Sequence, residues 1–392
     1  MTDPKPTRWF HLTPDRFVIG LLVVECLLWL SERVHFPAWH KGYAVLLALT
    51  VVGVAFLVML LWFIVALVFR LRFQFSIRSL LVLTIAVAIV CSWMPVEMKQ
   101  ANRERETAAA ITQMGGRVDS SEPSGPAWLR SRLGGSFFDN VQRVSLVDAD
   151  ITDEALDRLA EFGQLEQLTF GGPMGTKGSQ ITDAGLKHLS VMIQLKRVEL
   201  GWTHVTDVGL GHLKTLNQLQ ALDLNETNVT DAGLEQLKGL SQLRWLCLSG
   251  TKVTDNGLKH LKVLSRLESL FLTSTTVTDA ALENIEGLSQ LQQLTLGCTN
   301  VTDAGLKHLK GLRRLQLLGL SGPKITDAGL ENIEALGQIE WLNLFATNIT
   351  DTGLDHFTGL SQLHVLEIGG TKVTEEGVKK LQQALPNCKI TR

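Results

Sequence analysis

A fixed period dominates the C-terminal two thirds of this 392-residue chain. An aspartate in a V-T-D context recurs every 24 residues, and a glutamate takes its place in the final copy, at Asp207, Asp231, Asp255, Asp279, Asp303, Asp327, Asp351 and Glu375. Asp183 and Asp153 precede these, 30 residues apart, because residues 171–180 carry an insertion of six. Ten copies of one unit indicate a stack in which each copy contacts its neighbours.

Each copy combines a strand pattern with a helix start. In the copy that begins LQALDL at 219–224, Leu222 and Leu224 fall on one side of a strand. The following V-T-D-A-G-L predicts a helix whose first amides are capped by Thr230 or Asp231. Leucines at every third position then face inward, namely Leu234, Leu237 and Leu240. A single copy has nothing against which to bury these leucines, so the copies must stack.

The two sides of such a stack have different natural spacings. Neighbouring strands lie about 4.8 Å apart, whereas packed helices need roughly 8–10 Å. We therefore expect a curved solenoid with the strands on its concave face and the helices on its convex face.

The pattern L-x-x-L-x-L-x-x-T-x-V-T-D-A-G-L, over about 250 residues, resembles the leucine-rich repeat in its ribonuclease-inhibitor-like and F-box-associated variant. The resemblance implies an α/β horseshoe of about ten 24-residue repeats over 141–392. Threonine replaces the more usual Asn or Cys in one column, and Pro323 interrupts that column. Spans followed by repeats resemble bacterial membrane-anchored leucine-rich repeat proteins, which implies interaction rather than catalysis.

The N-terminal part is far more apolar. Residues 43–69 run without a charge, and a bilayer core of roughly 30 Å needs about 20 apolar helical residues. After a tail at 1–16, we expect an α-helical transmembrane region at 17–96 with helices at 17–36, 43–69 and 79–96. The first contains Glu25 and could instead be a re-entrant or surface segment. The long apolar runs do not fit a cleavable signal peptide.

The basic residues near the spans set an expected orientation. Six lie on the side of the N-terminus and five on the other, which favours a cytoplasmic N-terminus. We expect a multi-pass protein of the cytoplasmic (inner) membrane with the repeats on the extracytoplasmic side; losing the first span would reverse this. Residues 97–140 are expected to be a polar connector and an N-terminal cap, with a short amphipathic helix at 126–141.

The chemistry-bearing side chains repeat with the fold. His188, His212, His260, His308 and His356 recur at one helical position, so neighbours would stand nearly 10 Å apart, too far to share a metal ion. No catalytic or phosphate-binding motif is present, and a pI near 6.6 disfavours nucleic acid. The cysteines suggest no disulfide framework. We expect a non-enzymatic protein without metal or cofactor.

Departures from the pattern mark where a partner would bind. Most outward strand positions carry small or polar residues, but two groups carry large apolar ones. These candidates are Trp245 and Phe271 on adjacent copies, and Leu317, Trp341, Phe345 and Val365 on a second set of copies. Exposed apolar groups on an open sheet favour an interaction site; alternatively, they pack across the ladder and stabilise the sheet.

These features predict a membrane-anchored module that binds a protein or peptide on the concave face of the repeats and contacts the lipid bilayer through its N-terminal helices. Two alternatives remain open at this stage. One is a membrane signalling receptor, although no output domain is recognisable in the sequence. The other is an adaptor of a ligase-type complex, although no F-box is recognisable.

Overall fold

The computed structural model describes residues 53, 77–120, 140–147, 152–171 and 180–392. Two compact units are distinguished, Met1–Glu106 with Ser120–Asn140, and Thr107–Asp119 with Val141–Arg392. The predicted helices at 17–36 and 43–69 lie outside the described residues, apart from Gly53, and so does nearly all of the predicted segment 126–141.

Helix α3 (Ile77–Gln113) covers the whole of the predicted 79–96 segment and continues past Pro95. Within the part of the chain that the structure describes, no helix has both the length and the apolarity needed to cross a bilayer. The expected transmembrane region therefore has no support from the described residues. Helix α3 ends just before Gly115, whose φ of 90° needs the conformational freedom of glycine.

In the second unit, the repeats form a single sheet with strands in chain order, twelve among the described residues, and β2 to β12 pair in parallel. The strands are β1 (Arg117–Ser120), β2 (Val141–Ser145), β3 (Gln167–Thr169), β4 (Arg197–Glu199), β5 (Ala221–Asp223), β6 (Trp245–Cys247), β7 (Ser269–Phe271), β8 (Gln293–Thr295), β9 (Leu317–Gly319), β10 (Trp341–Asn343), β11 (Val365–Glu367) and β12 (Lys389–Thr391). The predicted α/β solenoid is confirmed for this unit.

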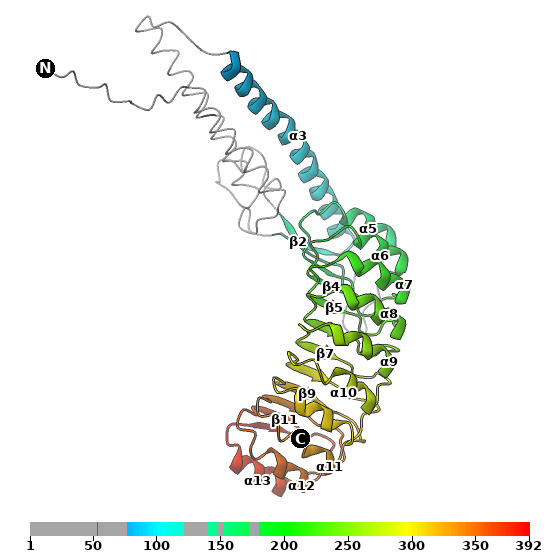
Figure 1. The fold of residues 1–392 in the computed structure, drawn as a ribbon, viewed down its shortest axis with the longest axis vertical. Coiled ribbons are helices and arrows are strands. Elements are labelled where there is room, and N and C mark those ends of the chain that lie inside the picture. The colour runs from blue at the N-terminus through cyan, green and yellow to red at the C-terminus, as the bar shows by residue number, and fades with distance from the viewer. Residues whose placement is uncertain (1–52, 54–76, 121–139, 148–151, 172–179) are drawn as a thin grey trace, which may run out of the picture. The chain divides into compact units, whose positions relative to one another are not determined.

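Short helices cover the other side of the sheet (Figure 1). The α-helices are α5 (Asp153–Leu159), α6 (Asp183–Leu189), α7 (Asp207–Leu210), α8 (Asp231–Gln236), α9 (Asp255–Leu258), α10 (Asp279–Ile285), α11 (Asp327–Leu330), α12 (Asp351–Leu354) and α13 (Glu375–Ala384). The described residues also form 3₁₀ segments on this side, namely η2 (Gly211–Thr215), η3 (Leu237–Gly239), η4 (Lys259–Val263), η5 (Leu306–Gly311) and η6 (Asp355–Phe357). Within the unit, the strands line the inner side of the curve and the helices the outer side.

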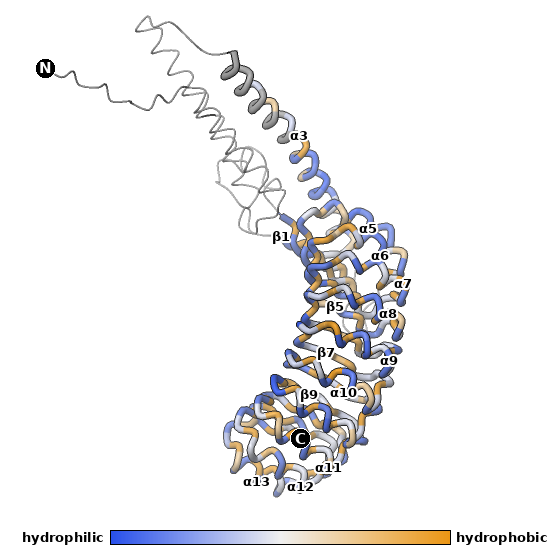
Figure 2. The backbone as a smooth tube through the Cα atoms, in the orientation of Figure 1, coloured by the Kyte–Doolittle hydropathy of each residue, from blue (hydrophilic) through white to orange (hydrophobic). Residues whose placement is uncertain are grey.

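The leucines of every copy meet in one continuous core. Leu222, Leu234, Leu237 and Leu240 are fully buried, as the sequence predicts. Hydrophobic and hydrophilic residues alternate within each copy (Figure 2). At the N-terminal end, Ile111 of α3 joins this core, and Thr107 donates a hydrogen bond of 2.7 Å to Glu161. The end of α3 therefore covers the first repeat; it lies within the connector and cap expected at 97–140, before the amphipathic helix expected at 126–141.

Aspartate and threonine side chains join each copy to the next. Thr254 donates its N–H to Asp231 Oδ1 at 2.7 Å and its hydroxyl to Oδ2 at 2.6 Å. The same pair of bonds is found at Asp153–Thr182, Asp183–Thr206, Asp207–Thr230, Asp255–Thr278, Asp279–Thr302, Asp303–Thr326, Asp327–Thr350 and Asp351–Thr374. We call this series the Asp–Thr ladder.

The ladder assigns separate tasks to the residues of V-T-D-A-G-L. The threonine also caps its own helix, as Thr254 does by accepting the N–H of Asn256 at 3.3 Å. The glycine leaves room for the carboxylate, because a Cβ on Gly257 would collide with Asp231. Asp231 thus serves the interface between copies, and Thr230 caps α8.

Beyond each strand from β4 to β11 the chain turns through a left-handed residue. This position holds Gly250, Gly322 or Gly370 in some copies, and Trp202, Glu226, Ser274, Cys298 or Ala346 in others. The backbone N–H of this residue continues the hydrogen bonding of the sheet between neighbouring copies. In one example, the Ala346 N–H donates to the Gly369 carbonyl at 2.7 Å. A side chain at positive φ is strained, so the hydrogen bond and the packing of the flanking leucines must offset the cost.

We expect Ala346→Gly to stabilise the protein by about 1 kcal/mol, because glycine adopts the φ of 55° without the Cβ clash. Urea unfolding checks this. The matched control is Ala280→Gly in α10, where glycine should instead cost about 0.5–1 kcal/mol. Equal losses at both positions would contradict the proposed strain at Ala346.

Candidate functional site

The concave face is formed by alternate residues of each copy. The middle residue of a strand points into the core, as Leu246 and Leu342 do with no exposed surface. The first and third strand residues and the second residue after the strand point the other way. We define the concave face by these three positions in every copy; in β10 they are Trp341, Asn343 and Phe345.

Trp245 and Phe271 lie on neighbouring strands but not opposite each other. Trp245 is in register with Ser269, and Cys247 with Phe271, so the two rings meet diagonally. Their centroids are 5.3 Å apart with the planes tilted by 46°. The Arg197 guanidinium lies 5.3 Å from the Trp245 ring centre. Of the two alternatives, an interaction site or packing between neighbouring strands, the second therefore occurs in this pair.

Leu317, Trp341 and Val365 form a row across three strands. They are direct neighbours in the registers of β9, β10 and β11. Phe345 has 54% of its surface exposed, and a Cβ on Gly369 would lie 3.0 Å from its ring, so the ring lies over that glycine. The Phe345 N–H donates to Asn343 Oδ1 at 2.8 Å, which fixes the backbone beneath the ring. These side chains form the more exposed of the two apolar groups.

An acidic group lies beside the first aromatic pair. Burial raises the pKa of Asp223 above its usual value, and the neighbouring Glu199 adds to this, against the hydrogen bond from Asn225 N–H at 2.8 Å. Burial, together with the charge of Asp223, raises the pKa of the Cys247 thiol to about 11. Such a thiol stays protonated at neutral pH and is not a nucleophile.

We expect Asp223→Asn to stabilise the protein at neutral pH, because it removes a partly desolvated charge while an amide oxygen still accepts from Asn225. A raised folded-state pKa means that the native carboxyl gains its proton first as the pH falls. The penalty is therefore fully present above the folded pKa and disappears as the pH drops towards 3.8.

The measurement is urea unfolding of wild type and variant across this pH range. The stability difference should shrink on acidification. Glu226→Gln is the control, since Glu226 is exposed on the next turn. A difference that is constant with pH would show that Asp223 carries no burial penalty.

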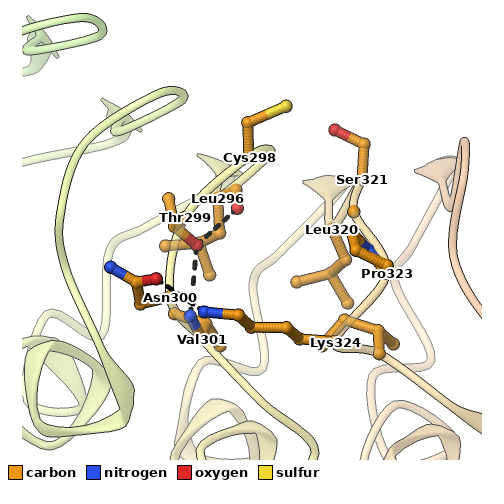
Figure 3. A pocket seen from close by; sticks show the side chains of 11 residues that line it. Leu296, Cys298, Thr299, Asn300, Val301, Leu320, Ser321, Pro323 and Lys324 are labelled. Atoms are coloured by element: carbon orange, nitrogen blue, oxygen red, sulfur yellow. Dashed lines mark hydrogen bonds between the residues drawn. The ribbon is translucent and has the colours of Figure 1, made fainter.

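A pocket of about 300 Å³ lies beside the left-handed turns at Cys298 and Gly322 (Figure 3). In other copies a threonine such as Thr347 gives both its N–H and its hydroxyl to the carbonyl of the leucine three residues earlier. Pro323 has neither donor, so the Leu320 carbonyl receives neither bond. Along the pocket wall, the Thr299 hydroxyl donates a hydrogen bond to the Leu296 carbonyl. Lys324 Nζ donates a hydrogen bond of 2.6 Å to Asn300 Oδ1.

Other polar side chains act within the scaffold. Three helical histidines pair with a carboxylate of the preceding copy, namely His188 with Asp157, His308 with Glu286 and His356 with Glu334. The described residues contain no group of three or more side chains suited to hold a metal ion. Within the same residues, Cys247, Cys298 and Cys388 are free thiols.

The comparisons with known proteins address the repeat itself. A sequence-family model described as "Leucine Rich repeat" matches residues 215–238, which is one full period. The copy at 215–238 is thus a leucine-rich repeat. The other copies share the same strand register and the same Asp–Thr ladder. No curated protein matches the chain.

Several solved structures are similar to this chain. Internalin C2 of Listeria monocytogenes is 23% identical, with 62% of this chain and 84% of that chain covered and a TM-score of 0.40. The L. monocytogenes internalin inlF is 20% identical, with coverages of 67% and 92% and a TM-score of 0.35. A leucine-rich repeat protein of Leptospira interrogans is 16% identical, with coverages of 60% and 74% and a TM-score of 0.37.

The sequence did not predict that Arg197 and Asp223 lie next to the candidate site. The signal was available in the period, because Arg197, Ala221 and Trp245 are 24 residues apart and share one column. A long side chain can cross a small one, so Arg197 reaches the Trp245 ring past Ala221. A residue at one position of a copy can therefore contact the residue at the same position two copies later.

Proposed function

We propose that this protein is a non-enzymatic interaction module whose leucine-rich repeats bind a protein or peptide on the concave face. The leucine-rich repeat fold is of the kind that generally serves protein–protein interaction. The observation that carries the proposal is the apolar group on β9–β11, in which Trp341 lies next to Leu317 and Phe345, two residues after β10, is 54% exposed. Aromatic side chains on an open, rigid surface are the usual energetic centre of an interface.

Site-specific photocrosslinking tests this function without a known partner. A photoreactive amino acid replaces Phe345 in the full-length protein in its own cells. The matched control replaces Val208, which is 69% exposed at the start of α7 on the helical side. We expect discrete protein adducts from position 345 that are absent from position 208. Adducts from 208 alone, or the same adducts from both positions, would argue against a concave-face partner.

The proposal includes a membrane anchor formed by the N-terminal region. The uncharged run at 43–69 is long enough to cross a bilayer core, and the distribution of basic residues favours the extracytoplasmic side for the repeats. The lipid bilayer of the cytoplasmic membrane is then the second partner.

A reporter fused after Arg392, combined with protease treatment of intact cells, tests this placement. We expect the reporter and the repeats to be accessible from outside. Repeats that resist the protease until the cells are lysed would place them in the cytoplasm. Recovery of the chain in the soluble fraction would remove the anchor from the proposal.

A further inference from the structure

The centre of the concave face carries no charged residue. From β6 to β10 its positions are occupied by Trp245, Cys247, Ser249, Ser269, Phe271, Thr273, Gln293, Thr295, Gly297, Leu317, Gly319, Ser321, Trp341, Asn343 and Phe345. Charged residues make up 19% of the whole chain. The centres of protein interfaces are depleted of charge and enriched in aromatic residues in the same way. We call this surface the uncharged floor.

Charges return on both flanks of the uncharged floor. On one side are Arg197, Glu199 and Asp223, where Arg197 is paired with Glu199. On the other side are Glu367 and Lys389, and Glu367 accepts a hydrogen bond of 2.7 Å from Asn343 Nδ2. A partner's charged side chain placed over the floor would lose its water without gaining a counter-charge, which is costly. The floor therefore favours an uncharged partner surface.

Large side chains stand at the two ends of the floor and small ones between them. Trp245 and Phe271 mark one end, and Trp341 and Phe345 the other. Between them lie Thr295, Gly297 and Gly319, where the Ser321 hydroxyl fills the space beside Gly297 and Thr295 packs against Gly319. The side chains that cover these two glycines are thus short and uncharged.

The polar groups of the floor suit an extended backbone. Hydroxyls and an amide are available from Ser249, Thr273, Gln293 and Ser321, and Thr273 already donates to Thr295 at 2.9 Å. An extended peptide has unpaired N–H and C=O groups that such side chains can satisfy. An α-helix satisfies its backbone internally and would leave these groups unused.

The strand spacing sets the distance between the two ends. Trp245 on β6 and Trp341 on β10 are four strand steps apart, roughly 19 Å at about 4.8 Å per step. An extended chain advances about 3.3 Å per residue, so it covers this distance in about six residues. A helix would need about 13 residues at 1.5 Å each.

We propose that the uncharged floor binds an extended, uncharged peptide segment that carries two large apolar side chains about six residues apart. One side chain contacts Trp245 and Phe271, whose rings meet, and the other contacts Trp341. The segment's backbone crosses the strands over the short side chains of Thr295 and Ser321, which cover Gly319 and Gly297. This inference rests on the proposed function, since it specifies the chemistry of the partner at the same face.

A displayed random-peptide library panned on the full-length protein in detergent tests the proposal. A double variant, Trp245→Ala with Trp341→Ala, serves for counter-selection. We expect the enriched peptides to lack charge between two apolar residues spaced by about six positions. Their binding should be the same at low and high salt, because no ion pair contributes.

Charge substitutions on the floor sharpen the test. Thr295→Glu and Thr295→Lys should each weaken the enriched peptides by about tenfold or more, because either sign places an uncompensated charge beneath the segment. Thr352→Glu, on the exposed start of α12, is the matched control and should change nothing. Circular dichroism confirms that each variant is folded.

Three results would overturn the inference. The first is enriched peptides with a charged centre, together with tolerance of one of the two Thr295 charges. The second is an anchor spacing of about 13 residues, which indicates a helix. The third is no enrichment over the double variant. None of these decides the proposed function, because photocrosslinking at position 345 reports on any concave-face partner, whatever its conformation.

Discussion

Replacing Asp231 by alanine should lower the free energy of unfolding by about 2–3 kcal/mol, the largest stability effect that we expect of a surface-facing carboxylate here. The change removes both bonds from Thr254, at 2.7 and 2.6 Å. The Thr254 N–H is then left in a partly buried interface without its acceptor, which costs more than the bond itself contributes. The leucine core beneath is unchanged, so the loss reports the ladder alone.

Urea unfolding followed by circular dichroism measures this loss. The matched control is Asp351→Ala, at the last step of the ladder, where the bonds to Thr374 are exposed to water. Water replaces the lost acceptor there, so the effect should be clearly smaller. Equal effects at 231 and 351 would mean that burial of the interface between copies does not set the strength of the ladder.

The largest binding effect is expected at Trp341. Trp341→Ala should weaken the partner captured through position 345 by about thirtyfold, which corresponds to the 2 kcal/mol typical of an interface hot spot. The ring lies in a row between Leu317 and Val365 and faces away from the core. Its loss therefore removes contact area for a partner and leaves the buried leucines in place.

Titration of the purified partner against wild type and variants measures this effect. Trp245→Ala provides the comparison, because that ring also packs on Phe271 and lies against Arg197 within the chain. We expect Trp245→Ala to cost more stability and Trp341→Ala to cost more affinity. An affinity unchanged within twofold in a folded Trp341→Ala protein would exclude Trp341 from the interface.

The repeat architecture followed from periodicity because one spacing appears in every copy. Leu234 and Leu237 were predicted to be buried, and both are. The role of Asp231 did not follow, since its partner Thr254 belongs to the next copy and local helix-capping rules consider only one helix. The left-handed Trp202 and Ala346 were equally hidden, because neither residue type signals a positive φ.

The sequence predicted which residues of the candidate site depart from the repeat pattern, but not which of them contact one another. Trp341 and Phe345 stood out against small residues at the same positions of other copies. The diagonal contact between Trp245 and Phe271 depends on register, and a side chain's choice of neighbour is decided by its rotamer. Pro323 was visible as a break in the threonine column, but the pocket that it lines with residues of two copies was not.

The Asp–Thr ladder has a consequence for how such a chain changes over generations. Each copy offers an aspartate to the copy after it and a threonine to the copy before it, with the same geometry at nearly every step. Units that present identical ends are interchangeable, so duplication or deletion of 24 residues in the middle rebuilds an intact joint. The number of copies, and with it the span between Trp245 and Trp341, can therefore be altered in single steps without inventing a new interface.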